Sequence, residues 1–91
     1  MVALMTDHPV IPIQYLVLCA ALSVKGGMEE YEALKAITIN PAAILGIDDR
    51  VGSIEKGKDA DIVIMNGHPF DTFSTTDMVL IDGEIAYKAE R

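Results

Sequence analysis

Asp7 is the residue of this chain whose type and position best suit chemistry. It lies in the polar cluster Thr6–Pro9, directly after the unbroken apolar run Val2–Met5. A carboxylate can bind a divalent metal and can accept the proton of a water that the metal activates. An aspartate before a proline is also common in turns, because its side chain hydrogen-bonds nearby backbone groups. Taken without further context, the residues favour the turn interpretation over the catalytic one.

A complete metal site is not readable in the 91 residues. A catalytic zinc site needs about three protein ligands and an open position, whereas the histidines of the chain, His8 and His68, lie 60 positions apart. The sequence also contains no Ser-His-Asp or Cys-His arrangement and no glycine-rich phosphate loop. His68 precedes Pro69 in a predicted loop, which indicates a structural role. We therefore expect this segment alone to be inactive and to bind no metal.

The length and composition limit both the fold and its partners. With 91 residues the chain forms at most one small domain, and it cannot enclose a (β/α)8 barrel, which needs about 250 residues. The apolar fraction of 51% is high for a small domain and indicates that part of the surface faces a partner. The net charge of −7 argues against nucleic acid and anionic membranes, because both bind through lysine and arginine.

The expected location is the cytoplasm. Cys19 is the single cysteine, so it cannot form an internal disulfide, and its apolar surroundings in the sequence predict a buried thiol. No secretory signal is recognisable. The apolar stretch Ile11–Val24 is shorter than the ~20 residues that cross a bilayer, so we expect no membrane span.

The elements that would position Asp7 are one strand, then helices, then three strands. Hydrophobic spacing, capping residues and turn signals give their bounds. The expected strands are Val2–Met5, Ala60–Met65, Met78–Ile81 and Glu84–Lys88, and the expected helices are Pro12–Lys25, Glu29–Thr38 and a short one with Asn40 as cap and Pro41 in its first turn, ending at Leu45. Asp82-Gly83 predicts a two-residue hairpin. This order suits either an α+β domain or the end of a barrel followed by strands of a second sheet, and the pattern alone leaves both open.

Two motifs in the second half of the chain are more specific. Asn40–Gly46 and Arg50–Val63, together with the hairpin Asp82–Tyr87, resemble the C-terminal signature of the amidohydrolase superfamily, above all its imidazolonepropionase-like, dihydroorotase-like and prolidase-like members. The resemblance implies an α/β to α+β fragment. Residues 1–46 would be the last strand and helices of a TIM-type (β/α)8 barrel, and residues 47–91 would be C-terminal strands of a composite β-sandwich.

The signature itself is expected to be structural. Gly52 and Gly57 can adopt backbone angles closed to other residues. Lys58, Asp59 and Asp61 are placed to pair charges and to cap backbone groups at the entry to a strand. We expect none of these residues to take part in chemistry.

The resemblance also implies an activity and a site. The full enzyme would hydrolyse C–N bonds of a small amide, cyclic amide or peptide-like substrate with a metal-activated water. Asp7, at the end of the last barrel strand, would be the metal ligand and the catalytic base. His8 is a candidate to line the substrate mouth, although the residues favour a solvent-facing histidine at this position. The metal would be zinc, manganese, iron or magnesium, since one carboxylate suits them all.

A second hypothesis treats the chain as an independent, non-catalytic interaction module. Both hypotheses predict a homo-oligomer or a strand-swapped dimer. The reason is the same in each case, because unpaired strand edges and apolar helix faces favour association.

Overall fold

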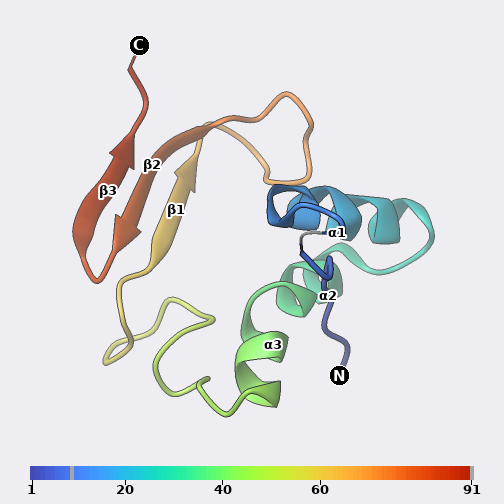
Figure 1. Ribbon diagram of the computed structural model, residues 1–91, viewed down its shortest axis with the longest axis horizontal. Helices are drawn as coiled ribbons and strands as arrows, with labels where there is room; N and C mark the ends of the chain where they lie inside the picture. Colours follow the sequence, from blue (N-terminus) through green and yellow to red (C-terminus); the bar gives the residue numbers. More distant parts are fainter. Residues whose placement is uncertain (9, 91) are drawn as a thin grey trace.

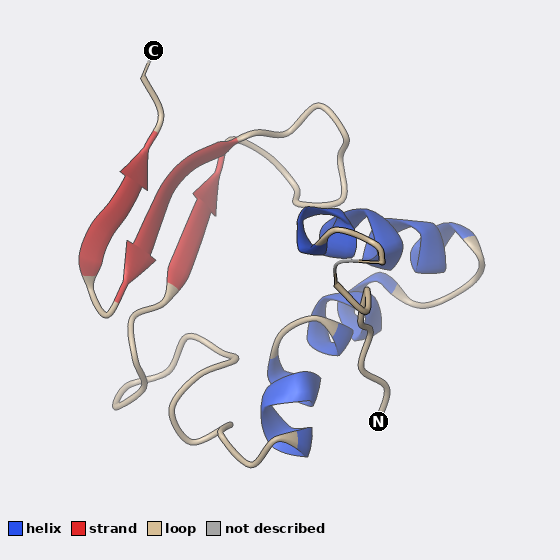
Figure 2. Ribbon diagram, viewed as in Figure 1, coloured by secondary structure: helices blue, strands red, loops and turns tan. Residues whose placement is uncertain are grey.

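Helices come first along the chain and strands last (Figure 1). The computed structural model describes residues 1–8 and 10–90. A 3-10 turn, η1 (Ile13–Tyr15), leads into α1 (Leu16–Lys25), which is followed by α2 (Glu30–Ala36), α3 (Ile39–Ile44), β1 (Ile62–Met65), β2 (Thr76–Ile81) and β3 (Glu84–Lys88). Figure 2 shows the strands on one side of the molecule and the helices on the other, connected by long loops.

The helix expected at Pro12–Lys25 is confirmed, with a tighter first turn. Pro12 flanks η1, and α1 continues from it to Lys25. The chain then turns at Gly26-Gly27, where the Gly26 amide donates to Leu22 O at 3.0 Å and Gly27 has a φ of 118°. Glycine is the residue that adopts such an angle without strain, which is why the helix ends there.

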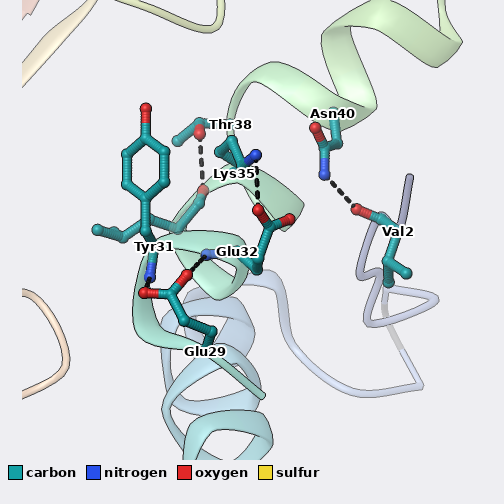
Figure 3. A network of polar contacts seen from close by, with 8 residues as sticks. Val2, Glu29, Tyr31, Glu32, Lys35, Thr38 and Asn40 are labelled. Atoms are coloured by element: carbon teal, nitrogen blue, oxygen red, sulfur yellow. Dashed lines mark hydrogen bonds and ion pairs between the residues drawn. The ribbon is translucent and has the colours of Figure 1, made fainter.

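Helix α2 begins after a side-chain cap at Glu29. The Glu29 carboxylate accepts hydrogen bonds from the backbone amides of Tyr31 at 3.0 Å and Glu32 at 2.9 Å (Figure 3). These bonds, the one from Tyr31 above all, hold the pKa of Glu29 below its usual range, because they stabilise the charged carboxylate. Further along, Lys35 pairs with Glu32 at 2.7 Å, and this hydrogen bond raises the pKa of Lys35.

The predicted role of Asn40 as a helix cap is wrong. Helix α3 starts two residues earlier, with Thr38 and not Asn40 in the flanking position, so Asn40 lies within its first turn. The Asn40 side chain is buried and its Nδ2 donates to the carbonyl oxygen of Val2 at 2.8 Å (Figure 3). The side-chain amide of Asn40, which local spacing predicted to cap the helix, therefore bonds a backbone carbonyl that is distant in the sequence.

The strand predicted at Val2–Met5 is also wrong for this chain. These residues carry no strand assignment, and their backbone bonds go to helices: Leu4 N donates to Ala36 O at 3.0 Å, and Val2 O accepts from Asn40. A strand requires a paired neighbour, and the sheet of the described residues contains β1, β2 and β3.

The sheet is an antiparallel meander in the order β1-β2-β3. The hairpin predicted at Asp82-Gly83 is confirmed, with φ angles of 52° and 77° that are typical of a type I′ turn. Its Asp82 amide donates to Asp61 Oδ1 at 2.8 Å, and its Gly83 amide donates to Ala60 O at 3.0 Å. Strand β2 begins at Thr76, two residues before the predicted start, and pairs there with Met65 across a bulge.

The core is small and made of alanines. The buried apolar side chains are Ala20, Ala33, Ala36 and Ala42, all on α1 to α3. Large apolar side chains stay exposed on both halves, among them Leu22 on α1 and Ile85 on β3. Cys19 is half-buried, not buried as predicted, because α1 has cover on one side only. In the described ranges, no helix has the length and hydropathy needed to cross a membrane.

Candidate active site

The segment around Asp7 is a closed turn that leads into η1. Val10 N donates to Asp7 O at 2.8 Å, and Ile11 N donates to Thr6 O at 3.3 Å. The amide of Ile13, the first residue of η1, donates to His8 Nδ1 at 2.9 Å. These bonds fix the backbone on both sides of Asp7, so its side chain projects from an ordered turn.

Asp7 has a left-handed backbone and an exposed side chain. Its φ is 54°, a conformation that aspartate and asparagine tolerate better than most residues. Asp82 has a similar φ of 52° in the hairpin between β2 and β3, so an angle of this kind is compatible with a tight turn. Within residues 1–8 and 10–90, no side-chain hydrogen bond or ion pair engages the Asp7 carboxylate, which is free to bind a ligand.

His8 has a structural contact that the sequence did not reveal. An imidazole nitrogen that accepts a hydrogen bond carries no proton, so the neutral ring has its proton on Nε2. The ring therefore anchors the start of η1 with one nitrogen and keeps one donor. His8 lies five residues before Ile13, and a histidine at this spacing is not a known capping motif. The sequence therefore could not predict this contact.

His68 lies apart from Asp7, on the loop between β1 and β2. Its Nε2 pairs with Glu30 Oε1 on α2, and its Nδ1 accepts from the Phe70 amide at 3.0 Å. The rings of His68 and Phe70 have centroids 5.3 Å apart. These contacts tie the loop to the first turn of α2 and give His68 a structural role.

The described residues do not bring together a metal site by themselves. They contain no group of three or more histidine, cysteine, aspartate or glutamate side chains placed to hold an ion. A shallow apolar hollow of about 260 Å³ lies between α1 and the loop after β1. Neither Asp7 nor His8 lines it.

The turn-rich segment between α3 and β1 uses its charged groups in pairs, as predicted. Arg50 binds Asp59 at 2.9 Å across the loop. The largely buried Lys58 bonds Ser53 at 2.7 Å and Glu55 at 2.9 Å. The hydrogen bond from Lys58, assisted by one from Ser53, lowers the pKa of Glu55. The charged side chains of this segment bind one another. This pairing explains their spacing in the sequence without a catalytic role.

Comparison with known proteins decides the family. The profile of the amidohydrolase family matches residues 2–86, nearly the whole chain. The chain belongs to the amidohydrolase family. Its backbone superimposes on the crystal structure of an amidohydrolase from Thermotoga maritima with a TM-score of 0.92 and 50% sequence identity, covering 96% of this chain and 23% of that one.

Two curated relatives also match this chain over only a small part of their own length. The amidohydrolase tasK of Hapsidospora irregularis is 38% identical over 78 residues, which is 86% of this chain and 8% of that protein. An imidazolonepropionase of Thermoplasma acidophilum is 50% identical over 44 residues, which is 48% of this chain and 11% of that protein. The chain thus spans about a tenth of the length of these relatives.

Proposed function

We propose that the chain is the C-terminal part of a metal-dependent amidohydrolase that hydrolyses C–N bonds in small amides, cyclic amides or peptides. One observation carries the proposal. Asp7 presents an exposed carboxylate, without a side-chain partner among the described residues, from a fixed left-handed turn. This turn lies inside the region that matches the family.

The proposed division places residues 1–46 in the last strand and helices of the barrel, and residues 47–91 in a composite β-sandwich. The separation of helices and strands in Figure 2 supports it. So do the outer edges of β1 and β3, which have no strand partner within the described ranges.

Asp7 fits a divalent metal, zinc or alternatively manganese, iron or magnesium, as one ligand of a larger set. An exposed carboxylate suits each of these ions, and the remaining ligands would come from the rest of the enzyme. The metal would supply a Lewis acid that lowers the pKa of water and polarises the amide carbonyl. Asp7 would hold the ion with its carboxylate and accept a proton from the attacking water. His8, anchored through Nδ1, would offer its Nε2 proton to the substrate.

Metal removal tests the proposal in a host that supplies the rest of the fold. In the grafted enzyme, residues 1–91 replace the matching segment of the Thermotoga maritima amidohydrolase, to which they are 50% identical. We expect it to bind divalent metal and to hydrolyse at least one member of a panel of cyclic amides, N-acyl amino acids and dipeptides. Chelation should abolish that hydrolysis, and added zinc or manganese should restore it. Hydrolysis that survives complete metal removal would contradict the proposal.

The free chain is proposed to associate with copies of itself. Ile81 and Ile85 on the sheet are 57% and 60% exposed, and Leu22 on α1 is 57% exposed. Apolar surface of this kind next to open strand edges favours association. We expect size-exclusion chromatography with light scattering to give a mass of at least twice 9.8 kDa. A stable monomer at micromolar concentration would contradict this expectation.

A further inference from the structure

Thr6, the residue before Asp7, is the most buried polar residue of the described chain. Its exposed fraction is 3%, in a structure whose apolar core consists of four alanines. The backbone at this point is fixed, because Thr6 O accepts from Ile11 N. Thr6 directly follows the apolar run Val2–Met5 of the sequence, and a valine would fill the same volume. Threonine differs from valine in having a hydroxyl group in place of a methyl group, so the hydroxyl is the feature to explain.

The Thr6 hydroxyl has no hydrogen-bond partner in residues 1–8 and 10–90. Burying a hydroxyl without a partner costs free energy, and nearly all such groups in folded proteins are paired. By contrast, even the exposed Thr38 donates its hydroxyl to a backbone acceptor, Leu34 O, at 2.6 Å. A buried hydroxyl without a partner beside Asp7 therefore indicates an acceptor that lies outside the described residues.

We propose that Thr6 is a positioning residue for Asp7. This inference rests on the proposed function. In the complete enzyme the Thr6 hydroxyl donates to an acceptor oxygen or nitrogen in the part of the fold that surrounds the metal. The bond holds the turn in which Asp7 has its φ of 54° and so sets the position of the carboxylate. Residues that orient a metal ligand typically change metal affinity when they are removed.

The test compares Thr6→Val, which keeps the shape and removes the hydroxyl, with Thr6→Ser, which keeps the hydroxyl. In the grafted enzyme we expect Thr6→Val to weaken metal binding by about 10- to 100-fold, measured by competition with a fluorescent chelator. Thr6→Ser should restore most of the affinity. Thr72→Val, at an exposed threonine of the loop between β1 and β2, controls for the substitution itself and should bind metal like the parent.

A second measurement uses the 91-residue chain without metal. If the hydroxyl has no partner there, Thr6→Val should unfold at a urea concentration equal to or above that of the parent. A lower midpoint would show that the hydroxyl is bonded within the chain and would overturn the inference. Unchanged metal affinity of Thr6→Val in the grafted enzyme would overturn it as well.

The outcome for Thr6 is separable from that for the proposed function. If Asp7→Asn lowers metal affinity and Thr6→Val does not, the positioning role fails and the function stands. If Asp7→Asn also leaves metal affinity unchanged, the proposed function fails, and with it the inference.

Discussion

Replacing Asp7 with asparagine is expected to abolish hydrolysis by the grafted enzyme and to leave its fold intact. The amide of asparagine can neither accept the proton of the attacking water nor bind a metal as a charged ligand. Removal of a general base typically lowers turnover by about 10²- to 10⁴-fold, and loss of a metal ligand should add to this. Steady-state kinetics and metal content per protein measure both effects.

Asparagine is the suitable replacement because of the Asp7 backbone. At a φ of 54°, most residues would add strain, whereas asparagine tolerates the left-handed region as well as aspartate does. The fold should therefore survive, and unchanged circular dichroism checks this. Asp49→Asn, at an exposed aspartate of the segment after α3, is the matched control and should keep full activity. Full hydrolysis by Asp7→Asn would remove Asp7 from the catalytic assignment.

Replacing Gly52 with alanine is expected to cause the largest loss of stability. Gly52 has a φ of 101°, and a β-carbon there would lie 2.9 Å from Ala42 Cβ and 3.0 Å from Ile39 Cα. Neither neighbour is the flexible end of a side chain, so α3 and the loop must move apart. Backbone strain and overpacking together should lower the free energy of unfolding by roughly 3 kcal/mol. Urea unfolding followed by circular dichroism measures the loss.

Gly57 provides the control that separates these two causes. It lies in the same segment with a φ of 92°, but no atom lies within 4 Å of the position that a β-carbon would occupy there. Gly57→Ala should therefore show the backbone strain alone, about 1–2 kcal/mol. If the two variants lose the same free energy of unfolding, the requirement for glycine at position 52 does not come from close packing against α3.

Local signals in the sequence were sufficient where the deciding interactions are local. The Asp82-Gly83 hairpin depends on two adjacent residues that accept positive φ, and it forms as predicted. The helix ending at Gly26-Gly27 likewise depends on nearby residues. The pairing of Lys58 with Glu55 spans three positions and that of Arg50 with Asp59 spans nine. The same motifs identified the family, which the match over residues 2–86 confirms.

Interactions between distant segments could not be predicted in this way. Asn40 has the residue type of a helix cap, yet its amide bonds Val2 O, 38 positions away, because the folded chain brings that carbonyl within 2.8 Å. Val2–Met5 has the composition of a buried strand, but strand formation depends on a neighbour that this chain does not place beside it. The sequence by itself determined that helices precede the three strands of the sheet, the turns at Gly26-Gly27 and Asp82-Gly83, and the family, and it indicated Asp7 as a candidate ligand, which stays a prediction. The tertiary structure decided the left-handed turn of Asp7, the anchoring of His8 and the burial of Thr6, since each depends on which backbone groups the fold brings together.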